Sequence, residues 1–430
     1  MSSAVKKSTV AAIVAVLIVA AVVGVYFMWP KPSPVVTEIK IGVNEPLTGA
    51  AADTGLLALQ GMRFAVDEIN AAGGVKSLGG INLTLVISDC AGDPKTGALE
   101  TERLITTENV VAVLGSYFSS VTKTASEVAE SYEVPFLNPD SISPSLTQRG
   151  FKWFFRTTPT DVHLVPEAFK YLDWLKTQYP GQINTIGVLH EDSEWGASWW
   201  ELIKNEAPKH GYSIVVEVKF KTGATSLDSE VLAVKEKNPD VLFQASYTTD
   251  TILLLNTIKR LNYAPKLMIG AAGIEQPYTL EATKELSHYQ HAITKFCWDF
   301  FAFNEKVKAK NEAFKKKFNK DLGEVAVRGY VAVYTMYYAI EEAGKTASPS
   351  DLKAFRTAIR DALKAIDIGK EPAWMIAPWD GVKFDENGDN IRARGIIVQV
   401  MPEDTKHHTV WPRELATEDP IFPMPPWEQR

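Results

Sequence analysis

The segment from Val110 to Gly150 constrains the fold most, because it repeats one short pattern of strand, polar loop and helix. Val110–Leu114 is a continuous apolar run ending at Gly115, as expected for a parallel strand covered on both faces. A predicted helix, Val121–Ser131, follows, and then a second short strand, Val134–Leu137. Parallel strands joined by helices are typical of a doubly wound α/β sheet.

Polar loops follow both of these strands. Ser116, Ser119 and Ser120 precede the helix, and residues 138–143 follow the second strand. In open α/β sheets ligands bind beyond the carboxyl ends of the strands, where helix N-termini offer free N–H groups. The two loops therefore predict half of a small-molecule cleft, although each serine taken singly is also explained by helix capping or turn chemistry.

The alternation of strands and helices occurs twice, from residue 38 to 150 and from residue 165 to 269. A chain of 430 residues is too long for one core, so we predict an α/β protein with two Rossmann-like lobes joined by hinge crossovers. Two later helices, near residues 304–319 and 325–342, are too few for a third core and are expected to pack on a lobe. The expected parts are lobe 1 (38–157 and 298–378), lobe 2 (158–297 and 379–405) and a Pro-rich tail (406–430).

The N-terminus indicates the compartment. Lys6 and Lys7 precede Val10–Trp29, an uncharged run of twenty residues that is long enough to cross the ~30 Å hydrocarbon core as a helix. We therefore expect residues 1–37 to hold an uncleaved membrane anchor and a Pro-rich linker, with a cleaved signal as the alternative. The lysines place the body of the chain outside the cell membrane.

Composition and motifs argue against several functions. A net charge of −7 without long basic runs is untypical of nucleic-acid binders. His190–Glu194 lacks the second histidine of a zinc protease. A calcium loop starting at Asp385 would need a glycine where Asn390 stands, so Asn387-Gly388 favours a turn instead. We expect no enzyme activity, no cofactor and no metal, and we expect Cys90 and Cys297 to be isolated buried thiols.

A series of short motifs follows a fixed order along the chain. They are Pro46-Leu47-Thr48-Gly49, Asp67-Glu68-Ile69-Asn70 with Gly73-Gly74, Asp93-Pro94, Gly115…Ser119-Ser120, Leu146-Thr147-Gln148-Arg149-Gly150 and Arg156-Thr157. In this order they resemble the extracytoplasmic solute-binding proteins of ABC importers of branched-chain amino acids and amides. That resemblance implies the type I periplasmic-binding fold over residues 38–405. It also implies a monomer that captures a small solute and docks an ABC permease. The alternative is a ligand-sensing extracellular receptor domain of the same fold.

The resemblance also implies a ligand site, made of Ser119, Asp140, Ser141, Ile142, Trp195, Tyr247 and Ala272. Ser119 would bind the ligand carboxylate, and Trp195, expected in a loop before a helix, would cover the ligand. Ile142 stands where the family has a threonine, and Ala272 stands where a glutamate pairs with the ligand ammonium. Losing both polar groups would cost on the order of a hundredfold in affinity.

We therefore expect an amide, an amine or another small polar ligand, with zwitterionic amino acids as the alternative. A carboxylate relocated to Asp140, Asp250 or Glu275 would replace the missing glutamate.

Overall fold

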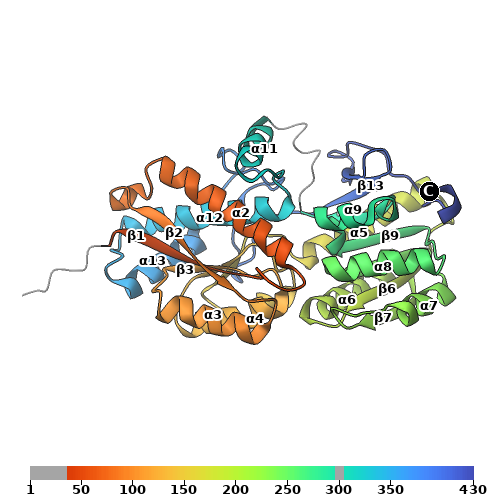
Figure 1. Cartoon of the computed structure of the whole chain (residues 1–430), viewed down its shortest axis with the longest axis horizontal. Coiled ribbons are helices and arrows are strands. Elements are labelled where there is room, and N and C mark those ends of the chain that lie inside the picture. The colour runs from red at the N-terminus through yellow and green to blue at the C-terminus, as the bar shows by residue number, and fades with distance from the viewer. Residues whose placement is uncertain (1–35, 296–304) are drawn as a thin grey trace, which may run out of the picture. The chain divides into compact units, whose positions relative to one another are not determined.

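The computed structural model describes residues 36–295 and 305–430, and their strands form two large sheets (Figure 1). The first sheet is parallel, in the order β2-β1-β3-β4-β5. Its strands are β1 Glu38–Glu45, β2 Asn82–Asp89, β3 Ala112–Gly115, β4 Phe136–Asn138 and β5 Phe154–Arg156. The helices of this first lobe are α2 Ala52–Ala71, α3 Pro94–Thr106, α4 Ser119–Ser131, α12 Glu324–Gly344 and α13 Leu352–Ala365.

The second sheet has the order β14-β13-β10-β9-β8-β6-β7, and β13 runs antiparallel to both of its neighbours, β10 and β14. Its strands are β6 Thr185–Glu191, β7 Ser213–Phe220, β8 Val241–Ser246, β9 Leu267–Ala272, β10 His291–Thr294, β13 Ile396–Met401 and β14 Lys406–Trp411. The helices of this second lobe are α5 Asp161–Gln178, α6 Glu194–Glu206, α7 Asp228–Lys237, α8 Thr248–Arg260 and α9 Pro277–Thr283. The alternation in the sequence therefore predicted β1 to β4 and β6 to β9, but not β5, β10 or β14.

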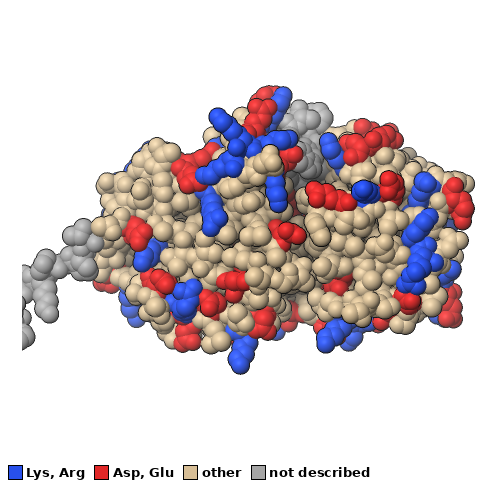
Figure 2. Space-filling model, in the orientation of Figure 1, with Lys and Arg blue, Asp and Glu red and all other residues tan. Residues whose placement is uncertain are grey.

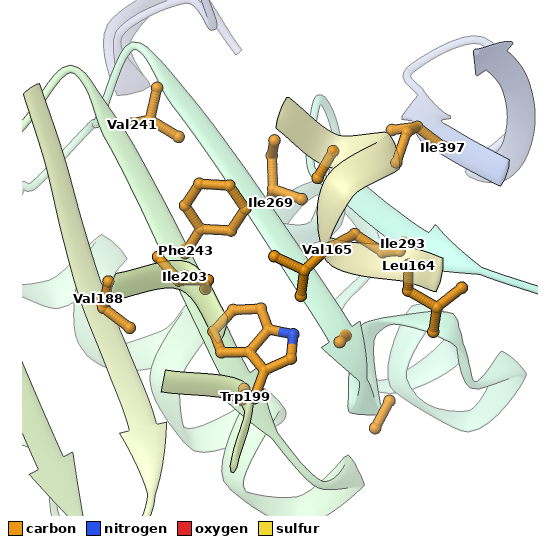
Figure 3. Close-up of a cluster of buried hydrophobic side chains, with 14 of the residues drawn as sticks. Leu164, Val165, Val188, Trp199, Ile203, Val241, Phe243, Ile269, Ile293 and Ile397 are labelled. Atoms are coloured by element: carbon orange, nitrogen blue, oxygen red, sulfur yellow. The ribbon is translucent and has the colours of Figure 1, made fainter. Parts of the chain in front are cut away.

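The core of the second lobe lies between its sheet and α5 and α6 (Figure 3). Trp199 of α6 packs edge-on against Phe243 of β8, with ring centroids 5.8 Å apart. Val188 and Ile269, from the strands that flank β8, are also fully buried in this cluster. Fully burying such side chains contributes about 1.5–3 kcal/mol each, so this core holds the strand ends in place.

The late helices pack on the first lobe, as predicted. Helix α12 lies against α2, where a Cβ atom at Gly61 would come 2.0 Å from the carbonyl oxygen of Ala326. Phe64 of α2 contacts both Tyr330 of α12 and Phe314 of α11 (Glu305–Phe318), with ring centroids 5.6 and 5.5 Å apart. Figure 2 shows the lysines of α11 gathered on one face.

The C-terminal segment wraps around the second lobe. Residues 406–411, predicted as the start of the tail, form β14 at the edge of the second sheet. Further along, Phe422, Met424 and Trp427 are buried, and the Trp427 indole N–H donates to the carbonyl of Tyr263 at 2.7 Å. A short ribbon, β11 Asp367–Ile368 with β12 Val382–Lys383, precedes the return of the chain to β13.

Several predictions fall outside these elements or need correction. The predicted anchor and Cys297 lie outside the described residues, and within 36–295 and 305–430 no helix is long and apolar enough to cross a membrane. Cys90 is free and buried, as predicted, and burial raises the pKa of its thiol to about 11. Strand β13 begins at Ile396, and Ile391 is exposed in the crossover that precedes it.

Candidate functional site

Six of the seven predicted site residues line one cavity of about 20 Å³ between the two lobes. They come from loops and helix starts that follow β3, β4, β6 and β8, and from the end of β9. The full lining is Tyr117, Ser119, Asp140, Ile142, Trp195, Tyr247, Ala272, Glu275, Gln276, Lys295 and Arg328. The loops chosen from the sequence therefore do converge, as expected for the carboxyl ends of parallel strands.

Ser141 is the predicted residue that the structure does not bring to this cavity. Its hydroxyl hydrogen-bonds with the Ser116 carbonyl and with the Thr122 hydroxyl, both at 2.7 Å, inside the first lobe. Its own carbonyl accepts a hydrogen bond from the buried Arg156 guanidinium at 3.0 Å. Ser141 therefore fixes the loop after β4 and leaves its neighbours Asp140 and Ile142 to line the cavity.

Ser119 is the first residue of α4, and its side chain is buried at the cavity. Phe118, the residue before it, cannot cap the helix, so first-turn N–H groups of α4 lack a side-chain partner. The Ser119 hydroxyl oxygen accepts a long hydrogen bond, 3.4 Å, from the Ser143 N–H. A helix N-terminus with a serine hydroxyl suits a carboxylate or another negatively polarised group.

Aromatic rings from both lobes form one wall. Tyr247, the residue before α8, has its ring centroid 4.6 Å from Phe118 and 5.6 Å from Tyr117 of the first lobe, and 5.1 Å from Trp195 of its own lobe. Trp195 was predicted in a loop, but it lies in the first turn of α6, because that helix starts at Glu194. The wall suits the apolar part of a small ligand.

Glu194 links the two lobes beside the cavity. Its carboxylate, on α6, accepts hydrogen bonds from the Lys123 ammonium of α4 at 2.9 Å and from the Ser145 hydroxyl. Burial raises the pKa of Glu194, but the bonds from Ser145 and Lys123 outweigh burial and lower it overall. This carboxylate therefore stays ionised at neutral pH and stabilises the contact between the lobes.

A chain of buried ion pairs crosses from one lobe to the other. In the first lobe Arg328 pairs with Asp140 at 2.9 Å and with Glu324 at 2.8 Å. Lys295 of the second lobe lies 3.9 Å from Glu324 and 3.2 Å from Glu275. All five residues are at most 8 % exposed, and the three carboxylates outnumber the two cations. A solute with a positively charged nitrogen would balance this excess.

A further buried carboxyl group, Glu45, lies beside Asp140. Glu45 at the end of β1 accepts a hydrogen bond from the Tyr117 N–H at 3.0 Å, and burial together with the charge of Asp140 raises its pKa strongly. Burial likewise raises the pKa of Asp140 to about 6, although Arg328 opposes the shift. Burial therefore makes both carboxyl groups hold a proton more readily than they would in water.

The three candidates for a relocated carboxylate differ in whether they line the cavity. Asp140 and Glu275 line the cavity, whereas Asp250 lies in α8 and accepts a hydrogen bond from the Gly223 N–H at 2.9 Å. Glu275 stands three residues after Ala272, the position where the expected glutamate is missing. Its carboxylate also accepts a hydrogen bond from the N–H of Ala272 at 2.8 Å.

The sequence did not predict Tyr117, Gln276, Lys295 and Arg328 in the lining. Arg328 had a visible signal, since it is a charged residue inside the apolar run Val325–Val333 of a buried helix. Lys295 had none, because it follows β10, a four-residue strand that carries no clear pattern. Among the described residues no group of side chains could hold a metal ion.

Known proteins are similar to most of this chain in sequence. Residues 38–388 match the sequence model of the periplasmic binding protein family. Two curated relatives are Leu/Ile/Val-binding protein homolog 8 of Brucella suis biovar 1 (strain 1330) and homolog 7 of Brucella abortus (strain 2308). The first is 28 % identical over 93 % of this chain and 97 % of its own length, and the second is 30 % identical over 91 % and 96 %.

Two solved structures have a similar fold. The leucine-binding protein LivK of Thermotoga maritima has a TM-score of 0.73 at 22 % identity, covering 88 % of this chain and all of its own. The branched-chain amino acid transporter substrate-binding protein LivJ of Streptococcus pneumoniae, solved with isoleucine, has a TM-score of 0.71 at 21 % identity, covering 86 % and 99 %.

Proposed function

The chain belongs to the periplasmic binding protein family, and from that premise we propose that it is the solute-binding component of an ABC importer. It would capture a small polar solute, such as an amino acid, an amide or a related compound, and deliver it to a membrane permease. The relatives named as Leu/Ile/Val-binding proteins support this role. So does the fold of a branched-chain amino acid transporter component.

One observation carries the proposal: the cavity joins side chains from both lobes, and six of them are residues that the resemblance implies for the ligand site. Ser119 and the N-terminus of α4 would hold the negatively polarised end of the solute. Asp140 and Glu275 would attract its nitrogen, and Trp195 with Tyr247 would cover its apolar part. Ile142 and Ala272 supply no side-chain hydrogen bond, so the solute would differ from leucine in its polar contacts.

Capture would proceed by closure of the lobes. A cavity of about 20 Å³ holds about one water molecule, so a solute enters only when the lobes separate. Contacts from both lobes then favour the closed state, and Glu194 adds its bonds to Lys123 and Ser145. This mechanism has no chemical step, so we propose no enzymatic activity and no cofactor. The monomeric state, the anchor within residues 1–37 and the extracytoplasmic location are parts of the same proposal.

A melting experiment with a panel of amino acids, amides and amines tests this function. We expect at least one compound to raise the melting temperature, since a solute that binds only the folded chain stabilises it. The variant Ser119→Ala should weaken that compound's binding about tenfold, by about 1.5 kcal/mol, whereas Ser120→Ala, one position along α4 and outside the cavity lining, should not. If both variants bind alike, Ser119 is not in the site. If leucine, isoleucine or valine far exceeds all other compounds, the site has not diverged.

A further inference from the structure

A second and larger chamber adjoins the candidate cavity. Its volume is about 300 Å³, and both lobes line it. Leu57 of α2 and Glu324 of α12 come from the first lobe, and Leu280 and Glu281 of α9 come from the second. Because it spans the two lobes, a molecule that fills the chamber would contact both of them.

The two spaces share a wall. Glu275 and Gln276, which follow β9, line the small cavity and the larger chamber alike. The Gln276 side chain donates to the carbonyl of Ala272 at 3.1 Å, and Ala272 itself lines the small cavity. A solute that extends from Ser119 and Trp195 into the chamber would therefore have to pass the side chains of these two residues.

The two spaces differ in volume. Ligand pockets in proteins are usually about 300–1,000 Å³, and the chamber reaches that range whereas the cavity of about 20 Å³ does not. A solute that extends from one into the other would bury more of its surface than a compact amino acid.

The chemistry of the chamber favours a positive group. Among the described residues, neither Glu324 Oε1 nor Gln276 Oε1 accepts a hydrogen bond, although both side chains are more than nine-tenths buried. Glu281 and Asp404 also line the chamber, against Lys406 and His407. These carboxylates add to the excess negative charge of the ion-pair chain, and acidic side chains gather around α9 on the face shown in Figure 2.

We propose that the solute is elongated: its head occupies the candidate cavity, and a tail ending in an ammonium or guanidinium group occupies the chamber. Glu324 and Gln276 would accept hydrogen bonds from that group, and Glu281 would attract it from the rim. This proposal rests on the proposed function and specifies its substrate class.

Matched pairs of solutes test the proposal by titration calorimetry. Lysine and norleucine differ only in the terminal ammonium, as do cadaverine and pentylamine. We expect the charged member of a pair to bind at least tenfold more tightly. A neutral member that binds as tightly as its charged partner would overturn the proposal and leave the solute-binding function intact. If no compound in the panel binds, both proposals fail.

Two variants locate the charged group. Glu281→Lys should weaken binding of the charged solute about 3- to 10-fold, since Glu281 is exposed at the rim. Glu285→Lys is the matched control, because Glu285 is also exposed, lies four residues away and does not line the chamber. Leu280→Trp, which fills the chamber, should weaken the charged solute and spare a compact one such as alanine amide. Equal effects of the two lysine variants, or equal effects of Leu280→Trp on both solutes, would contradict the assignment.

Discussion

The contact between Glu194 and the first lobe gives the sharpest prediction about closure. Replacing Glu194 by Gln keeps the size of the side chain and removes its charge. The partly exposed pair with Lys123 is worth about 0.2–1 kcal/mol, and the Ser145 bond loses about 1 kcal/mol when its acceptor becomes neutral. The closed state should therefore lose about 1–2 kcal/mol, which corresponds to about a 5- to 30-fold change.

The assay is the dissociation rate of whichever solute raises the melting temperature most, followed by stopped-flow tryptophan fluorescence. Glu194→Gln should release the solute about 5- to 30-fold faster, since both bonds form between the lobes. Glu201→Gln is the control, because it removes the 3.2 Å pair with Lys204 within α6 and touches no other lobe. Equal dissociation rates for the two variants would refute the claim that Glu194 stabilises closure.

Three further predictions concern stability. Arg328→Leu should lower the free energy of unfolding by about 3–5 kcal/mol, because it leaves Asp140 and Glu324 buried without their cation. A loss below about 1 kcal/mol in chemical denaturation would contradict the role of the ion-pair chain. Burial raises the pKa of Asp161 to about 8 from an ordinary 3.8, so between these values the folded chain binds more protons than the unfolded chain. The stability of the chain should therefore fall as the pH rises from about 4 to 8. Asp161→Asn should flatten that fall in melting curves, and an unchanged slope would contradict the argument. Gly61→Ala should lower the free energy of unfolding by about 1–3 kcal/mol, because the added methyl group meets a backbone carbonyl of α12. An unchanged free energy of unfolding would show that α2 and α12 separate easily.

Periodicity predicted much of the fold, because long elements carry a repeated signal. Strands β1 to β4 and β6 to β9, and helices such as α2 and α12, followed from apolar runs and their spacing. Strand β10 and helix α9 were missed, since four and seven residues are too few for a pattern to stand out. The start of α6 at Glu194 was missed, and this put Trp195 in a loop rather than in the first turn.

The candidate site was predictable where it follows the strand ends. Ser119 and Tyr247 come directly after strands, so topology alone brings them together. The pairing of Arg328 with Asp140 joins residues 188 positions apart, and nothing local in the sequence indicates it. Ser141 was misplaced for a similar reason, because its hydrogen bonds to Ser116 and Thr122 depend on the packing of β4 against β3.

The central claim is that two lobes close on a small solute, and small-angle X-ray scattering tests it most directly. The radius of gyration should fall when a saturating solute is added to the wild-type chain. Ser119→Ala at the same solute concentration should keep the larger radius, because it binds too weakly to close. A solute that binds the wild-type chain tightly without changing its radius of gyration would contradict the account.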